Sequence, residues 1–149
     1  YVSSLDGTTR ESALAAAGVY DYNYVPDYIV INLGTNDSGG PAPDDEFSLA
    51  AKDLVSKVRA RYPEAQIVWM YGLMSTLYAE TLRKTVREIN KTDKKVHFLF
   101  ADSIFGNESE TGANGHPNVR ASIRASALLY KKIRSVTGWK NKLKVEDAE

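Results

Sequence analysis

The chain has 149 residues, 43% of them hydrophobic, which is enough to bury one core, so a single domain over 1–149 is expected. Its 19 acidic and 19 basic side chains cancel, which removes the electrostatic argument for nucleic-acid binding, and the absence of cysteine excludes disulfides and thiolate chemistry. No apolar run approaches the ~18 residues that span a bilayer, so no membrane partner is expected.

We divide the chain into a lead-in (1–27), a core (28–137) and a tail (138–149). In the lead-in, a short helix is predicted from Arg10 to Ala17. A group of tyrosines follows, and it fits either a loop packed against the sheet edge or a sugar-stacking surface: Tyr20, Tyr22, Tyr24 and Tyr28. The lysine-rich tail is expected to be solvated.

The apolar run from Ile29 to Leu33 predicts a strand buried on both faces. This strand breaks at Gly34, and Thr35, Asn36 and Asp37 follow at once. Because ligands of open α/β sheets bind outside the carboxyl ends of the strands, these polar residues lie at a candidate site. The glycines and prolines of residues 38–43 favour an irregular loop.

The rest of the core alternates between helices and strands. Asp44 is expected to cap a helix that Pro63 ends, with a buried stripe of Phe47, Ala51, Leu54, Val55, Val58 and Tyr62. Further elements are predicted as a strand (Gln66–Tyr71), a helix (76–91), a strand (Lys95–Ala101) and a helix (118–136). Crossovers of this length join parallel strands, so the fold class is α/β: a three-layer α/β/α sandwich with a parallel, flavodoxin-like sheet.

Three strands make a very small parallel sheet, and both edges of such a sheet are normally covered. Residues 1–27 contain no convincing strand to flank the first one. We therefore expect that the first one or two strand–helix units of this domain are absent from the chain. A missing N-terminal segment or a second chain would then complete the sheet.

Two short motifs carry chemistry: Gly34-Thr35-Asn36-Asp37 at a strand end, and Gly115-His116-Pro117-Asn118 before the last helix. Pro117 suits the first turn of that helix. Together, in order and on matching elements, the two motifs resemble the SGNH, or GDSL-like, hydrolase superfamily. The longer stretch from Pro26 to Asp37 makes the chain most similar to carbohydrate esterase family 2, over roughly residues 20–137.

The resemblance implies a secreted, cofactor-free and metal-free esterase with the SGNH hydrolase fold, which removes O-acetyl groups from a plant polysaccharide such as xylan. It implies that His116 is the general base and that Asn36 is an oxyanion-hole donor, with Gly34 and Asp37 supporting the loop. The chemistry fits, because histidine side chains ordinarily titrate near pH 6.5 and amide N–H groups stabilise oxyanions.

The chain departs from the family pattern at two places. No Gly-Asp-Ser occurs in it, so the nucleophilic serine is expected from a segment outside this chain. Ala113 stands where most of the superfamily has the aspartate that orients the histidine. The acceptor for the His116 ring is then either a backbone carbonyl or one of Asp102, Glu108 and Glu110.

Plainer interpretations remain open. His116 also fits a helix-capping loop residue, and Asn36 fits an Asx-turn that closes the strand. His97 and Trp69 fit packed positions, no motif assigns Tyr78 a role, and two histidines are too few for a structural zinc site. The alternative functions are an SGNH lipase or thioesterase and a non-catalytic carbohydrate-binding remnant. No serine of the chain is a convincing substitute nucleophile: Ser3, Ser4, Ser38 and Ser103 fit loop or cap positions.

Overall fold

The computed structural model describes residues 23–138. The expected helix from Arg10 to Ala17, two of the clustered tyrosines (Tyr20 and Tyr22) and the tail beyond Gly138 lie outside the described residues. The described elements are β1 (Tyr28–Ile31), η1 (a 3₁₀ helix, Asn36–Gly39), α2 (Asp44–Arg61), β2 (Gln66–Gly72), α3 (Ala79–Thr92), β3 (Val96–Ala101), η2 (a 3₁₀ helix, Ala113–Gly115) and α4 (Val119–Thr137).

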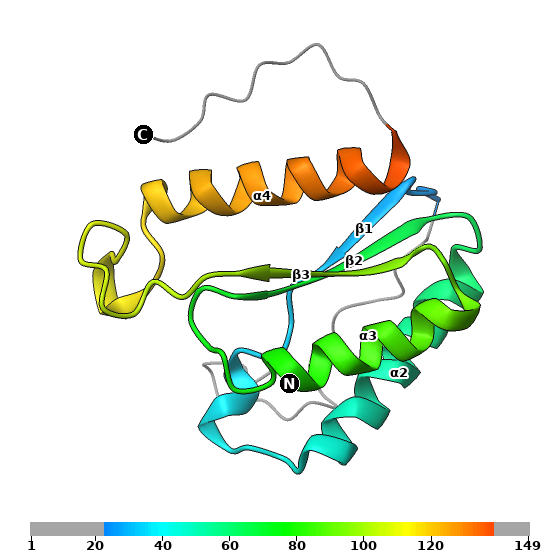
Figure 1. The fold of residues 1–149 in the computed structure, drawn as a ribbon, viewed down its shortest axis with the longest axis horizontal. Coiled ribbons are helices and arrows are strands. Elements are labelled where there is room, and N and C mark those ends of the chain that lie inside the picture. Colours follow the sequence, from blue (N-terminus) through cyan, green and yellow to red (C-terminus); the bar gives the residue numbers. More distant parts are fainter. Residues whose placement is uncertain (1–22, 139–149) are drawn as a thin grey trace.

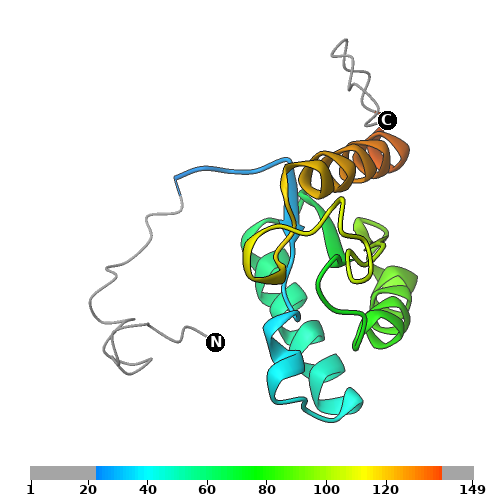
Figure 2. The same cartoon turned by 90° about the vertical axis from the view of Figure 1, so that its left-hand side faces the viewer.

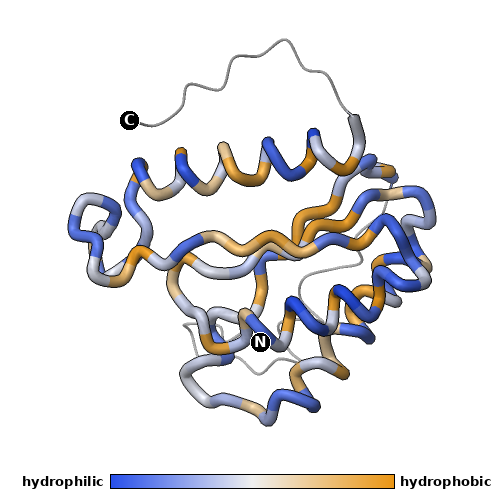
Figure 3. Tube along the Cα trace, viewed as in Figure 1, coloured by the Kyte–Doolittle hydropathy of each residue, from blue (hydrophilic) through white to orange (hydrophobic). Residues whose placement is uncertain are grey.

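The predicted α/β class and the three-layer arrangement are confirmed. The three strands form one parallel sheet in the order β1-β2-β3. Helix α4 lies on one face of this sheet, and α2 and α3 lie on the other (Figure 1). Figure 3 shows apolar residues along the strands and at intervals along the helices, and their buried members form two clusters. Because the strands are parallel, all three end at the same edge of the sheet. Figure 2 views this edge, with the loop after β3 in front.

Strands β1 and β2 differ in length. The ladder between them runs from Tyr28 opposite Gln66 to Ile31 opposite Trp69, whereas β2 continues to Gly72 alongside β3. Trp69 is 3% exposed, and its indole N–H donates to the carbonyl of Leu33, at 3.2 Å, just beyond the end of β1. The chain after Ile31 thus leaves the sheet, whereas β2 continues beside β3 to Gly72.

The prediction that the first strand is buried on both faces is wrong. Val30 is 42% exposed, and Leu33, which lies beyond the strand, is 57% exposed. The reason is topological: no strand among residues 23–138 lies on the outer side of β1, and α4 contacts β2 and β3 but not β1.

The predicted apolar stripe of α2 is confirmed in its buried members. Ala51 and Val55 are each 3% exposed, and Phe47, Leu54 and Val58 pack against the same core. Asp44, however, does not cap the helix. It is the first helical residue, and Pro43 occupies the cap position. The acidic side chains of the first turn therefore stabilise the helix through its dipole and not through a capping hydrogen bond.

Three other boundaries differ from the prediction. Regular structure occurs within the glycine-rich segment, since Asn36–Gly39 forms η1. Helix α3 begins at Ala79 rather than near residue 76, because the N–H of Ala79 closes a turn on the carbonyl of Thr76 at 3.0 Å. Pro117 lies before α4 rather than in its first turn, because Asn118 is the cap and its Oδ1 accepts the N–H of Ala121 at 3.1 Å.

Candidate active site

The turn after β1 is fixed by Gly34. Its φ is +112°, a conformation that side-chain-bearing residues rarely adopt, and a Cβ there would lie 3.0 Å from ring atoms of both Phe47 and Tyr71. Ser38 then closes the next turn, because its N–H and its hydroxyl both donate to the carbonyl of Thr35, at 3.2 and 2.7 Å. Asn36 begins η1 between these two fixed points.

Packed aromatic side chains support this turn. The rings of Phe47 and Tyr78 stack with centroids 3.8 Å apart, and the Tyr78 hydroxyl donates to the carbonyl of Ala42 at 2.9 Å. The backbone N–H of Tyr78 donates to the Tyr71 hydroxyl at 3.3 Å. Tyr78 is only 1% exposed, so it is a core residue rather than a surface for a substrate.

The second motif lies on a tight loop between β3 and α4. The N–H of Gly112 donates to the carbonyl of His116 at 2.7 Å, and the N–H of His116 donates to the carbonyl of Ala113 at 3.1 Å. Thr111 and Pro117 form an isolated antiparallel bridge. The backbone of His116 is thus held on both sides, and its side chain is exposed.

Glu110 is not the acceptor for the His116 ring. It is 6% exposed, and its two carboxylate oxygens accept from Nε and Nη2 of Arg124, at 2.7 and 2.8 Å. The hydrogen bonds from the Arg124 guanidinium hold the pKa of Glu110 below its usual value. Among residues 23–138 no side chain or carbonyl, including those of Asp102 and Glu108, hydrogen-bonds to the His116 ring.

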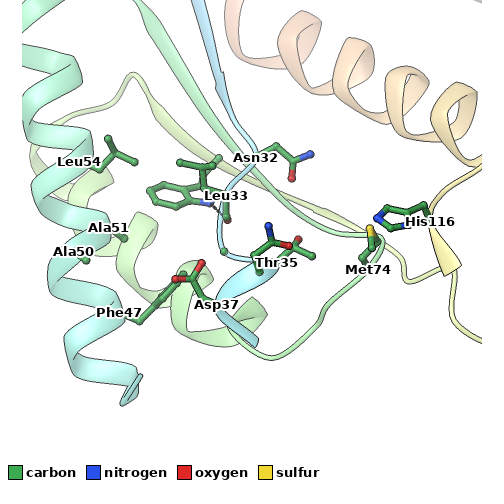
Figure 4. A pocket seen from close by; sticks show the side chains of 13 residues that line it. Asn32, Leu33, Thr35, Asp37, Phe47, Ala50, Ala51, Leu54, Met74 and His116 are labelled. Carbon is green, nitrogen blue, oxygen red and sulfur yellow. Dashed lines mark hydrogen bonds between the residues drawn. The ribbon is translucent and has the colours of Figure 1, made fainter. Parts of the chain in front are cut away.

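The two motifs line one open cleft of about 490 Å³ at the carboxyl edge of the sheet. In Figure 4 His116 and Met74 lie on one side of this cleft and the side chains of α2 on the other. The full lining comprises Asn32, Leu33, Gly34, Thr35, Asn36, Asp37, Phe47, Ala50, Ala51, Leu54, Trp69, Met74 and His116. The amide and the imidazole, eighty positions apart in the sequence, therefore share one cavity.

Both candidate polar groups are available to a ligand. Asn36 and His116 are exposed, and neither side chain hydrogen-bonds to another residue in the described part of the chain. The Asx-turn interpretation of Asn36 therefore finds no support. Asp37 contributes to the turn through its backbone carbonyl, which accepts the N–H of Gly40 at 3.3 Å.

Sequence reasoning missed the apolar wall of the cleft. Met74 and Phe47 were not predicted as site residues, and Trp69, correctly predicted as core, also lines the cleft. Met74 could have been found by the same rule that singled out Asn36, since it follows the carboxyl end of β2.

His97 is the other histidine of the chain, and it is packed on the sheet as predicted. Its Nε2 hydrogen-bonds to Oε1 of Gln66 at 2.9 Å, and partial burial lowers the pKa of its ring. No cluster of metal-ligating side chains occurs within residues 23–138. Of the helices in that range, none has the length and apolar character needed to cross a membrane.

Comparison with known proteins identifies the family. The model of the GDSL-like lipase/acylhydrolase family matches residues 4–122. The chain belongs to this family. The chain is 34% identical over 125 residues to the cellulase/esterase CelE of Acetivibrio thermocellus, and this match covers 78% of the chain and 15% of CelE.

Solved structures agree with this assignment. A family two carbohydrate esterase from Clostridium thermocellum, in complex with cellohexaose, superimposes with a TM-score of 0.78 at 32% identity. The match covers 85% of the present chain and 42% of the esterase. An acetyl xylan esterase from the rumen bacterium Butyrivibrio proteoclasticus gives 0.70 at 25% identity, covering 89% and 43%. The chain thus spans less than half the length of these three relatives.

Proposed function

We propose that this GDSL-like domain belongs to an esterase that removes O-acetyl groups from a plant polysaccharide such as xylan. The observation that carries the proposal is the shared cleft, which brings the amide of Asn36 and the imidazole of His116 to one edge of the sheet. Relatives that are carbohydrate esterases, one of them bound to cellohexaose and another an acetyl xylan esterase, support a carbohydrate ester as the substrate.

His116 would act as the general base. Its imidazole takes the proton of a serine hydroxyl while the serine oxygen attacks the carbonyl carbon of the acetyl group. The carbonyl oxygen becomes an oxyanion, which accepts a hydrogen bond from the Asn36 amide. The imidazolium then returns its proton to the sugar oxygen as the ester bond breaks, and a water molecule releases acetate from the serine by the same steps.

The nucleophilic serine would come from a segment outside these 149 residues. Two observations support this part of the proposal: Gly-Asp-Ser is absent from the sequence, and the chain covers only 42% of the esterase from Clostridium thermocellum. Gly34 would contribute by shaping the turn that presents Asn36. The complete protein would work outside the cell, where a plant polysaccharide is found.

The test compares the chain with and without a serine-bearing segment. We expect residues 1–149 alone to have almost no activity on aryl acetates. Adding the upstream segment of a family two esterase should restore turnover, and His116→Ala should abolish that turnover. His97→Gln is the matched control, because it removes the other imidazole while its partner Gln66 lies on the sheet, away from the cleft.

Three outcomes would count against the proposal. Activity of the isolated chain that depends on His116 would mean that the nucleophile lies within it. Preference for long acyl chains or thioesters over acetylated xylan would favour a lipase or thioesterase. Glycan binding without hydrolysis, even with the serine segment present, would identify a binding module.

A further inference from the structure

We infer that the Glu110–Arg124 ion pair is a positioning pair for His116: it holds the histidine loop through the backbone and thereby sets where the imidazole stands in the cleft. This inference deepens the proposed function, because it rests on His116 acting as the base. Neither side chain lines the cleft, so the pair acts on His116 and not on a ligand.

The loop that carries His116 has two arms joined by backbone hydrogen bonds. Glu110 lies on the first arm, and its carbonyl accepts the N–H of Asn118 on the second arm at 2.9 Å. The Asn118 amide returns a hydrogen bond to the carbonyl of Ser109, also at 2.9 Å. The bond from Gly112 to His116 continues the same ladder, so a displacement of the first arm moves the second arm with it.

Arg124 fixes this ladder to the rest of the domain. From α4 its guanidinium binds both carboxylate oxygens of Glu110, and Nη2 also donates to the carbonyl of Asp102, the residue after β3, at 3.0 Å. A planar guanidinium makes such a two-oxygen contact at a defined orientation. The pair therefore connects three parts: α4, the end of β3 and the histidine loop.

Positioning through the backbone is needed here because the imidazole has no partner of its own in the described chain. In many hydrolases an acid contacts the catalytic histidine and orients it directly. Here the acid nearest in sequence, Glu110, binds Arg124 with both of its carboxylate oxygens. The orientation of the ring then depends on the backbone of a loop whose first arm is held by Glu110.

The domain also contains a matched control pair at the opposite edge of its sheet. Arg59 binds both carboxylate oxygens of Asp93, at 2.7 and 3.3 Å, and donates to three nearby carbonyls. Its side chain is 21% exposed, close to the 26% of Arg124. The Arg59–Asp93 pair joins α2 to the end of α3, remote from the cleft.

The experiment compares Arg124→Gln, Arg124→Lys and Glu110→Gln with Arg59→Gln. The first readout is the NMR chemical shift, at a fixed pH, of the imidazole Cε1–H signals of the 149-residue chain, which has only two histidines. The second is the hydrogen exchange of the Gly112 amide, and the third is kcat and KM on an acetyl ester after the serine-bearing segment is added. Thermal unfolding of every variant reports its stability.

We expect Arg124→Gln to change the His116 chemical shift and speed Gly112 exchange while the His97 signal stays unchanged. It should lower kcat on the order of 10-fold to 100-fold with little change in KM, and Arg124→Lys should recover part of this loss. Arg59→Gln should lower the melting temperature without affecting His116 or kcat. If Arg124→Gln does not fold, Glu110→Gln provides the comparison, because it keeps the shape of the side chain.

The inference is overturned if the Arg124 and Glu110 variants leave the His116 signal and Gly112 exchange unchanged. It is equally overturned if Arg59→Gln changes both to the same extent, because the pair would then be an ordinary stabilising contact. Failure of the proposed function gives a different result, since the wild-type protein with its serine segment would show no esterase activity while the NMR effects remain.

Discussion

Gly34→Ala is the sharpest test of how the cleft is built. At a φ of +112° an alanine carries a backbone strain of about 1–3 kcal/mol. Its Cβ would also lie 3.0 Å from ring carbons of Phe47 and Tyr71, which must move by a few tenths of an ångström. Together these terms predict a loss of about 2–4 kcal/mol in the free energy of unfolding.

The assay is urea unfolding followed by far-UV circular dichroism, with the melting temperature as a second measure. For a chain of this size the loss corresponds to a fall of roughly 10 °C. Gly39→Ala is the matched control. It lies in the same segment, has no positive φ, and nothing lies within 4 Å of its added Cβ, so its stability should change by less than about 0.5 kcal/mol. Equal stability of the two variants would refute the reasoning.

Three further predictions concern the site and its supports. In the esterase with its serine segment, Asn36→Ala should lower kcat by roughly 10²–10³-fold with little change in KM, measured on an aryl acetate; an unchanged kcat would remove Asn36 from the oxyanion hole. Because Arg124 lowers the pKa of Glu110 from its usual 4.5, the carboxylate stabilises the fold fully above that value and loses this effect as the pH falls through the lowered pKa. Wild type should therefore lose its stability advantage over Glu110→Gln in acid, and a pH-independent difference would contradict this. Tyr78→Phe removes the hydrogen bond to Ala42 and should cost about 1 kcal/mol in urea unfolding, whereas no loss would mean that the bond contributes nothing.

Much of the fold could be predicted because the apolar patterns of its helices and strands, and the residues of its turns, are local in the sequence. The α2 stripe from Phe47 to Val58 repeats at helical spacing, and the β2 residues from Ile67 to Tyr71 form one apolar run. Both elements were predicted within about two residues of their ends. Element ends that depend on tertiary contacts were missed, as at Pro117, whose bridge with Thr111 keeps it out of the helix.

The burial of the first strand could not be predicted in this way. Ile29 to Leu33 resembles an inner strand by composition, but the position of a strand within a sheet depends on its neighbours. With β2 alone beside it in the described chain, Val30 and Leu33 remain exposed.

The site was predicted in part. Asn36 was found because it follows a strand end, and His116 was found because its motif resembles that of the SGNH hydrolases; both line one cleft. The partner of Glu110 was not found, since Arg124 lies 14 positions away and no sequence period connects a loop carboxylate to a helical arginine. The candidate roles of Asn36 and His116 remain predictions for the kinetic tests described above.

The register between β1 and β2 determines where Asn36 lies for the proposed chemistry. Successive residues of a strand advance by about 3.3 Å, so a slip of one position between Ile31 and Trp69 would carry Asn36 by that distance. Such a step far exceeds the roughly 0.5 Å within which a catalytic group must be held, and it would also turn each side chain to the opposite face. The apolar contacts that select this pairing therefore also determine where an oxyanion could be stabilised.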